Sequence, residues 1–309
     1  MGIVESFRAP ERVFVLRWAW ASLIANTVII LTGGVVRLTA SGLGCPTWPK
    51  CTDASFVPHS SLGIHGVIEF GNRMITYVLI AVAVATLIVV WRWAGSSRHL
   101  RRVATALALG IPLQGVIGGI TVLTDLNPWV VALHLLLSLA LVSGSVLLIV
   151  RVAGIGSTPV VPWAARLVFA IYAVGWVVVY LGTVVTGSGP HAGDRDALRN
   201  GLDPHLMSQV HAVAVYLLVA LTVVAIWSLR GSGSPYRWAI SLLGVLLVQG
   251  AIGFIQYWTG LPIALVALHL LGASVLVAVA TRLLLAVDPG RGTEVGSAQE
   301  GIDRGGDEQ

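Results

Sequence analysis

The stretch Val131-Ala132-Leu133-His134-Leu135-Leu136 is repeated as Val266-Ala267-Leu268-His269-Leu270-Leu271. Each copy begins 17 residues after the start of a Gln-Gly-x-Ile-Gly-x-Ile run, which starts at Gln114 in one half and at Gln249 in the other. The copies are offset by 135 residues, from His134 to His269. The repeat therefore places a histidine inside each of two hydrophobic segments, and a buried imidazole needs a partner.

The rest of the chain is similarly apolar. Its 309 residues are 56% hydrophobic and 11% charged, with a mean hydropathy of +0.86, whereas a soluble domain carries about 25% charged residues. A bilayer is crossed by about 20 apolar residues, and we expect eight such spans. They are residues 14–38, 64–91, 103–123, 129–150, 162–186, 206–229, 237–257 and 263–285. The sequence predicts an all-α membrane protein with eight transmembrane helices. No basic patch with interleaved aromatics suggests a nucleic-acid partner.

The basic residues predict the orientation. They gather before the first span and in the even-numbered loops, at Arg8, Arg12, Arg17, Arg92, Arg98, Arg101, Arg102, Arg151, Arg166, Arg230 and Arg237. The opposite loops have fewer, or balance them with aspartates. Because cytoplasmic loops are enriched in Arg and Lys, we expect a multi-pass plasma-membrane protein with both termini in the cytoplasm. No cleavable signal peptide is evident.

The repeat divides the chain into two units of four spans. We expect an N-terminal four-helix bundle over residues 1–153, a linker over 154–162 and a C-terminal four-helix bundle over 163–287. Since each unit has an even number of spans, the two are predicted to be parallel repeats. The Gly-rich, acidic segment 288–309 has little to bury and is predicted to be a disordered cytoplasmic tail.

Three histidines lie at matched depth. His134, His211 and His269 each follow, by six or seven residues, a proline near the start of a span, which places them about 10 Å below the helix start. His65 opens its span nearer the surface. Any one of them could be a structural hydrogen-bonding group, but facing histidines in a four-helix bundle are a way to hold a haem between two imidazoles. Zinc is less favoured because no carboxylate or thiolate ligand is repeated with them.

The two halves differ in the second span of each unit. His65, Glu69, Asn72 and Arg73 share one helical face, and Glu69 is the only acid well within a span. An offset of 139 residues maps Asn72 onto His211. Glu69 is a candidate proton carrier or substrate-orienting group, although a structural Glu69–Arg73 ion pair would explain it too. Arg73 could instead bind a carboxylate such as a haem propionate.

Cys45 and Cys51, the only cysteines, lie in the first predicted outer loop. Their position outside the membrane favours a disulfide, which could be either a static staple or a redox-active pair. The corresponding loop of the second half has no cysteine. The sequence therefore suggests one half specialised for chemistry and the other for holding a cofactor.

These residues resemble bacterial haem A synthase over nearly the whole chain except the tail. The resemblance is carried by Thr32-Gly33-Gly34-Val35-Val36-Arg37, Ser41-Gly42-Leu43-Gly44-Cys45-Pro46, Trp48-Pro49, Cys51, Ile68-Glu69-Phe70 and the twin Gln-Gly and Leu-His motifs. It implies an eight-helix membrane enzyme that oxidises the C8 methyl of haem O to a formyl group, giving haem A for aa3-type cytochrome oxidases.

The resemblance also implies roles for individual residues. His211 and His269 match the two histidines that hold a haem b in the C-terminal half. Glu69 matches an essential glutamate, and His134 a histidine, of the N-terminal half that receives the substrate haem. Cys45 and Cys51 match the family's paired outer-loop cysteines.

One departure concerns the substrate half. Many members have Glu-x-x-His-Arg where this chain has Glu69-Phe70-Gly71-Asn72-Arg73, and an amide is no substitute for imidazole as an iron ligand. Either His65 ligates the substrate iron instead, or His134 is its sole histidine ligand.

Two other functions fit parts of the pattern. A di-haem b electron-transfer protein linked to quinol would share the histidines, but would not need Glu69 or the cysteines in one half only. A transporter would share the parallel repeat. For the synthase, the expected partners are haem O and haem A, a haem O synthase and cytochrome oxidase assembly factors. A second copy of the chain is a further candidate partner.

Overall fold

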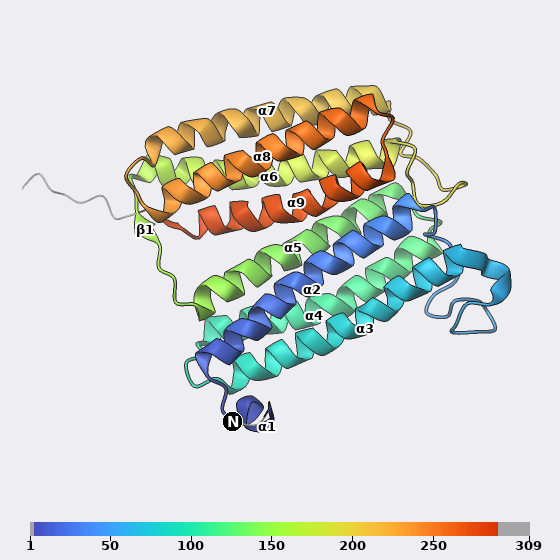
Figure 1. Ribbon diagram of the computed structural model, residues 1–309, viewed down its shortest axis with the longest axis horizontal. Coiled ribbons are helices and arrows are strands. Elements are labelled where there is room, and N and C mark those ends of the chain that lie inside the picture. Colours follow the sequence, from blue (N-terminus) through green and yellow to red (C-terminus); the bar gives the residue numbers. More distant parts are fainter. Residues whose placement is uncertain (1–2, 290–309) are drawn as a thin grey trace, which may run out of the picture.

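Figure 1 shows the computed structural model, which describes residues 3–289. The helices are α1 (Ile3–Arg8), α2 (Arg12–Leu38), α3 (Gly63–Arg92), α4 (Arg98–Leu123), α5 (Pro128–Val152), α6 (Pro162–Ser188), α7 (Pro204–Ser228), α8 (Ser234–Trp258) and α9 (Ile263–Leu284). A 3-10 turn, η1 (Ser60–Leu62), precedes α3, and two short strands are β1 (Thr158–Pro159) and β2 (Val287–Asp288).

Eight helices in the described part of the chain, α2 to α9, are long and apolar enough to cross a membrane. They follow the predicted spans in order, so the prediction of an all-α protein with eight transmembrane helices is confirmed. The helix starts carry local signals. Proline occupies the first turn of α5, α6, α7 and α8, where its missing N–H costs nothing. Asn127 and Asp203 cap α5 and α7 through side-chain oxygens.

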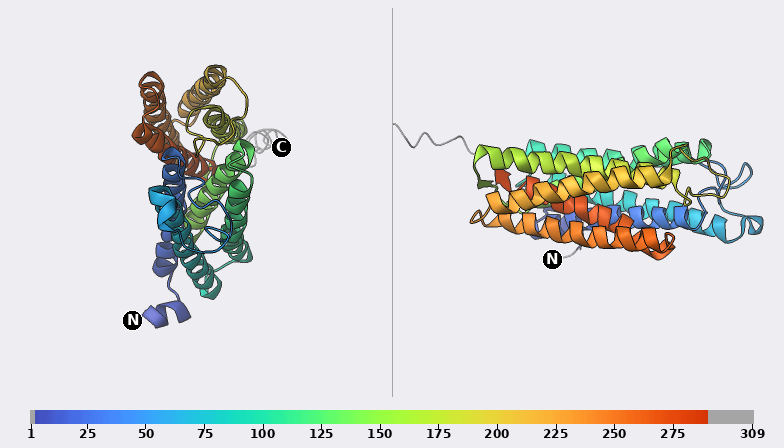
Figure 2. Two further views of the ribbon diagram at one scale, coloured as in Figure 1. Left: turned by 90° about the vertical axis from the view of Figure 1, so that its right-hand side faces the viewer. Right: turned by 90° about the horizontal axis from the view of Figure 1, so that it is seen from above.

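The helices pack as two rings of four. In one ring α2, α3, α4 and α5 each contact their neighbours, and in the other α6, α7, α8 and α9 do the same. The end-on view in Figure 2 shows the two groups side by side. Contacts of α5 and α2 with α9, and of α5 with α6, join them.

The interface between the rings is close-packed and partly polar. A Cβ on Gly34 of α2 would lie 2.2 Å from Leu270 Cδ2 of α9, so the Leu270 side chain packs directly on this glycine. Nearer the other end, the Ser143 hydroxyl lies 2.9 Å from both the Tyr172 hydroxyl of α6 and the Thr281 hydroxyl of α9. One core cluster, which includes Leu139, Leu218 and Leu276, crosses the interface.

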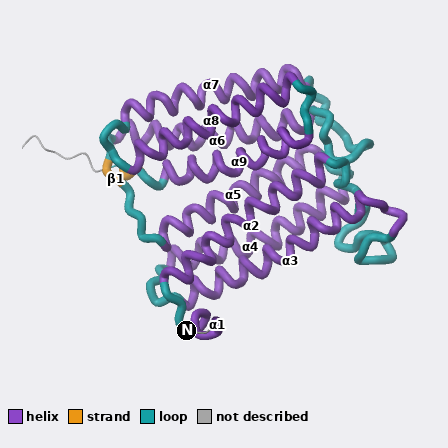
Figure 3. The backbone as a smooth tube through the Cα atoms, in the orientation of Figure 1, coloured by secondary structure: helices purple, strands orange, loops and turns teal. Residues whose placement is uncertain are grey.

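The ends of the molecule differ. The long segments 39–62 and 189–203 lie together at one end, called here the loop end, on the right of Figure 3. The helix α1 and the strand β1 lie toward the opposite end, the terminal end. There β1 of the linker pairs in parallel with β2, through Thr158 N–H to Ala286 O and Val160 N–H to Asp288 O. Asp288 therefore pairs with the linker, and residues 290–309 of the predicted tail lie outside the described residues.

Candidate functional site

His211 on α7 and His269 on α9 each lie against a glycine of the preceding helix. A Cβ on Gly182 would lie 3.3 Å from His211 Cε1, and a Cβ on Gly253 would lie 3.6 Å from His269 Cε1. The Nδ1 atoms of both rings are buried without a hydrogen-bond partner. The structure therefore places both predicted ligands in the same ring of helices, each beside a glycine.

Packing around this pair is uneven along the second ring. Between Pro204 and Leu217, α7 has no buried residue, and the loop-end part of α8 beyond Leu246 has none either. In α9 the first buried residue is Ser274. Below this level, Leu218, Leu246 and Leu276 join the main core cluster. The side chains of α7, α8 and α9 are thus more exposed at the level of the histidines than beneath them.

These features fit a haem held between two imidazoles. A buried polar atom without a partner is a rare exception that needs an explanation, and the Nδ1 atoms of both His211 and His269 are such exceptions. Small residues beside the rings let neighbouring helices support the imidazole planes closely. Within residues 3–289, no group of three or more His, Cys, Asp or Glu side chains could hold a bare metal ion.

His134 on α5 repeats the arrangement in the first ring. A Cβ on Gly118 of α4 would lie 3.3 Å from His134 Cε1, and its Nδ1 is also buried without a partner. Gln114 Nε2 donates to the His134 carbonyl at 3.0 Å and to Ser138 Oγ at 2.6 Å. The Gln-Gly-x-Ile-Gly motif thus has a physical role, because its glutamine ties α4 to α5 and its last glycine supports the imidazole.

Asn72 occupies the place on α3 that His211 occupies on α7. A Cβ on Gly33 of α2 would lie 4.0 Å from Asn72 Nδ2, just as Gly182 of α6 lies beneath His211. Thr32 donates its hydroxyl hydrogen to Asn72 Oδ1 at 2.8 Å. The first ring therefore has an amide, already hydrogen-bonded, where the second ring has an imidazole.

Glu69 is almost fully buried, with 5% of its surface exposed. Its Oε2 accepts a hydrogen bond from the Cys45 backbone N–H at 2.5 Å, and its Oε1 accepts from Arg73 Nη2 at 2.5 Å and Nε at 3.2 Å. The Glu69–Arg73 ion pair considered from the sequence is therefore present. Oε2 therefore bonds to the loop that contains the cysteines and Oε1 bonds to Arg73 of α3, so neither carboxylate oxygen is without a partner.

Arg73 also fastens the cysteine loop itself. Its guanidinium donates to the carbonyls of Cys45 at 3.0 Å, Thr47 at 3.1 Å and Lys50 at 3.1 Å. Cys45 and Cys51 form a disulfide, which confirms the predicted pairing. The residues 45–51 are called the cysteine loop below. Sequence spacing placed Arg73 near Glu69, but no local signal could show that the same side chain binds three backbone carbonyls of the loop.

Trp48 brings the cysteine loop to the other side of the first ring. A Cβ on Gly119 of α4 would lie 2.4 Å from Trp48 Cδ2, so the indole packs directly on that glycine. Gly118, which supports His134, is its neighbour in the chain. The loop thus reaches from the Glu69–Arg73 pair on α3 to the helix that supports the His134 ring.

His65 lies apart from this centre. It is exposed at the loop end of α3, and its Nδ1 is 2.9 Å from Ser41 Oγ. Among the described residues, none of the hydrogen bonds found joins His134 to His65, Glu69 or Asn72. The structure brings Glu69 to Arg73 and the cysteine loop, and places His65 at the rim.

Arg37 connects the two halves of the chain at the loop end, a role that the sequence did not indicate. From α2 it donates to the His191 carbonyl at 2.7 Å and to the Thr186 carbonyl at 3.1 Å, both in the second half. His191 Nε2 in turn lies 3.0 Å from the Leu261 carbonyl. Arg37 therefore ties segment 189–203 of the second half onto the first half.

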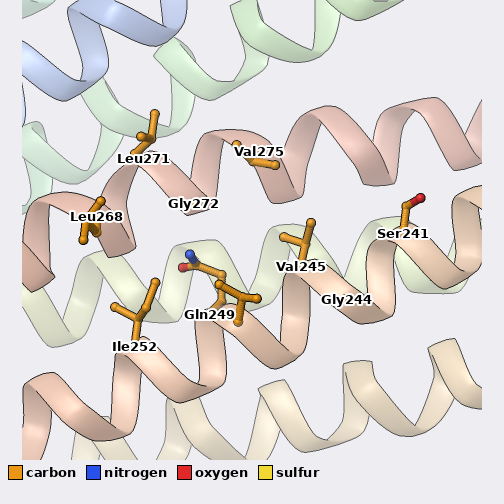
Figure 4. Close-up of a pocket in the computed structure, with 10 residues that line it drawn as sticks. Ser241, Gly244, Val245, Gln249, Ile252, Leu268, Leu271, Gly272 and Val275 are labelled. Atoms are coloured by element: carbon orange, nitrogen blue, oxygen red, sulfur yellow. The ribbon is translucent and has the colours of Figure 1, made fainter.

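A groove of about 430 Å³ runs between α8 and α9, and Figure 4 shows its lining. It is almost wholly apolar, with Gln249 reaching across it to Gly272. Gln114, the counterpart of Gln249, bonds to Ser138, whereas the residue 135 positions after Ser138 is Ala273. The repeated glutamine therefore has different surroundings in the two halves.

Residues 16–281 match the model of a family described as cytochrome oxidase assembly protein. The chain is 30% identical over 272 residues to a protein named Heme A synthase from Halalkalibacterium halodurans, covering 82% of this chain and 90% of that one. It is 26% identical over 290 residues to one of the same name from Geobacillus kaustophilus, covering 87% and 90%. A third, from Symbiobacterium thermophilum, is 27% identical over 257 residues, covering 74% and 83%. With its eight transmembrane helices, its histidine-bearing repeats and its cysteine loop, the chain belongs to the haem A synthase family.

Proposed function

We propose that this protein is a haem A synthase, which oxidises the C8 methyl of haem O to the formyl group of haem A. Family membership over residues 16–281 is the observation that carries the proposal. It favours this activity over the di-haem electron-transfer protein and the transporter. The asymmetry of the two rings supports it as well, because a buried acid and a disulfide belong to the half of the chain that contains His134, and the described part of the other half has neither.

His211 and His269 are proposed to hold haem b in the second ring. Their glycine supports and unpaired Nδ1 atoms fit a planar group ligated from both faces. When bound, haem b supplies one-electron redox chemistry. The surrounding α7, α8 and α9 orient the two imidazoles, and the core beneath them limits how deeply the group can enter.

The first ring is proposed to receive haem O as the substrate. His134 would face the substrate iron from α5, with its backbone fixed by Gln114. Asn72, held by Thr32, is not suited to ligate iron and instead leaves one face of the substrate without a second imidazole. His65 at the rim is assigned to the entrance of this half rather than to the iron.

Glu69 is proposed to act on the proton released as the methyl carbon is oxidised. Its Oε1 is committed to Arg73, so Oε2 is the oxygen that can exchange the Cys45 N–H for a proton. The cysteine loop, fastened by Arg73, would then exclude water from the carboxylate while substrate is bound. Because the Arg73 guanidinium is already bonded to Glu69 and to the cysteine loop, we do not propose that it binds a haem propionate.

The experiment that tests this function is co-expression with a haem O synthase, followed by extraction and chromatography of haems. Wild-type protein should accumulate haem A, and Glu69→Gln should abolish haem A while haem b content stays unchanged. Glu11→Gln, which makes the same chemical change at an exposed position before α2, should behave as wild type. Haem b alone at two per chain in the wild type would instead indicate electron transfer, and absence of haem would indicate transport.

The membrane location and partners are part of the same proposal. The Arg-rich loops support cytoplasmic termini in the plasma membrane, and the product implies contact with haem O synthase and cytochrome oxidase assembly factors.

Lys50, the only lysine in the chain, lies in the cysteine loop and is exposed. An amine-reactive reagent that cannot cross the plasma membrane should therefore label Lys50 in intact cells, provided that the reagent can reach the outer face of that membrane. Labelling of Lys50 only after cell lysis would show that the cysteine loop faces the cytoplasm, which is the opposite orientation.

A further inference from the structure

The corner between α3 and α4 at the terminal end contains a second apolar cavity, of about 370 Å³. It is lined by Leu87, Ile88 and Trp91 of α3, by Arg92 at the end of α3, and by Thr105 of α4. Leu87 and Ile88 lie about one turn before Trp91 and thus farther from the helix end. The cavity therefore has an apolar part toward the middle of the membrane and a basic rim at its boundary.

A second arginine, Arg101, contacts a residue of the lining. The Arg101 guanidinium lies over the Trp91 ring at 5.6 Å from the ring centroid, and Trp91 Nε1 donates to Thr105 Oγ1 at 3.2 Å. Arg101 Nε is buried without a hydrogen-bond partner, and so is Ser96 Oγ in the turn between the two helices. A buried guanidinium N–H without an acceptor is costly, so this corner has donors for which the described residues supply no acceptor.

The charge around the cavity is one-sided. Residues 91–102 contain four arginines, at positions 92, 98, 101 and 102, and no aspartate or glutamate. Arg92 uses Nη1 for the Phe7 carbonyl at 3.3 Å, and Arg101 lies over the Trp91 ring. An anion at this rim would meet two positive charges held in place by an aromatic ring and by backbone.

We propose that this cavity binds an anionic glycerophospholipid from the leaflet at the terminal end. The phosphate would accept hydrogen bonds from Arg101 and Arg92, and one acyl chain would lie against Leu87, Ile88 and Trp91. A phospholipid has its charge at the membrane boundary and its apolar chains below, which is the order of groups in this cavity. Basic pockets between transmembrane helices recognise anionic headgroups in this way. The site is separate from the histidines and does not depend on the proposed activity.

The test is native mass spectrometry of purified protein equilibrated in mixed micelles with equal amounts of phosphatidylglycerol and phosphatidylcholine. Wild-type protein should retain phosphatidylglycerol preferentially. Arg101→Gln should lower its retention about fivefold, and the Arg92→Gln/Arg101→Gln double variant by about 25-fold, since each arginine near a membrane surface contributes about that factor toward anionic lipid. Phosphatidylcholine retention should not change.

Two further variants separate a built site from general attraction to positive charge. Arg237→Gln removes an exposed charge at the start of α8, in the same leaflet, and should leave retention as in wild type. Ile88→Trp fills the apolar part of the cavity without changing charge, and should lower retention of phosphatidylglycerol. Equal losses for Arg237→Gln and Arg101→Gln, or no preference for phosphatidylglycerol in the wild type, would overturn the proposal.

Discussion

Arg73 is predicted to keep the cysteine loop closed over Glu69, and Arg73→Gln should open it. In the structure the guanidinium donates to three loop carbonyls at 3.0 to 3.1 Å, in addition to its ion pair with Glu69. A glutamine side chain is shorter and has one donor group, so it cannot satisfy these acceptors together. The disulfide would still close the cysteine loop, but the contact between this loop and α3 would be weakened.

The expected magnitude follows from the lost bonds. Each intramolecular hydrogen bond contributes about 1 kcal/mol net, so loss of three carbonyl bonds lowers the free energy of loop opening by about 3 kcal/mol. Since 1.4 kcal/mol is a factor of ten, the population of the open loop should rise roughly 100-fold. Loss of the ion pair with the buried Glu69 acts in the same direction.

Lys50 provides the assay, because it is the only lysine in the chain. A lysine-specific endoprotease can cut after this residue alone, and the cut requires the loop to leave its bound conformation. When opening and closing are fast relative to cleavage, the cleavage rate follows the open population. The rate should therefore increase about 100-fold in Arg73→Gln, measured under reducing denaturing electrophoresis so that the disulfide does not join the fragments.

A matched control variant tests whether the loss of any exposed arginine at the loop end increases cleavage at Lys50. Arg195→Gln alters an exposed arginine in segment 189–203 and should leave cleavage at Lys50 at the wild-type rate. An increase of less than about threefold in Arg73→Gln would refute the argument, because even one carbonyl bond of ordinary strength is worth more than that.

Other variants test the remaining parts of the site. Gly182→Ala should perturb the haem b spectrum more than Gly253→Ala, since the new Cβ would lie 3.3 Å from one imidazole and 3.6 Å from the other; equal spectra would remove the support role of Gly182. Arg37→Gln should lower stability in detergent by about 2 kcal/mol, because two carbonyl bonds to the second half are lost, and an unchanged unfolding transition would show that this tie is dispensable. His65→Ala should leave the spectrum of the haem-O-loaded first half unchanged, because this side chain is exposed at the rim; a shifted spectrum would make it a ligand.

The local pattern predicted the helices well because each span is long and apolar and begins or ends at a recognisable residue. Pro128, Pro162 and Pro204 each begin a helix close to its predicted start. The repeat also indicated that Asn72 corresponds to His211, and each of these side chains lies beside a glycine of the preceding helix. The disulfide was predictable because only one pairing exists for two cysteines.

The contacts that shape the candidate site were not predictable in the same way. The sequence placed His65, Glu69, Asn72 and Arg73 on one helical face, which is a local property set by 3.6 residues per turn. It did not determine that Glu69 and Arg73 face the cysteine loop, while Asn72 faces Thr32 and His65 faces Ser41. These partners come from α2 and the loop after it, and long-range pairing depends on how helices pack.

By itself, therefore, the sequence determined an eight-span membrane protein with two related halves, and it predicted which histidines would ligate haem. Hydropathy and helical period are properties of neighbouring residues, so they can be read without a partner. The tertiary structure decided that glycines of neighbouring helices support the imidazoles and that Arg73 fastens the cysteine loop over Glu69. Those features arise only when separate helices approach one another, because backbone carbonyls and glycine surfaces are present everywhere in a sequence and become specific partners through packing.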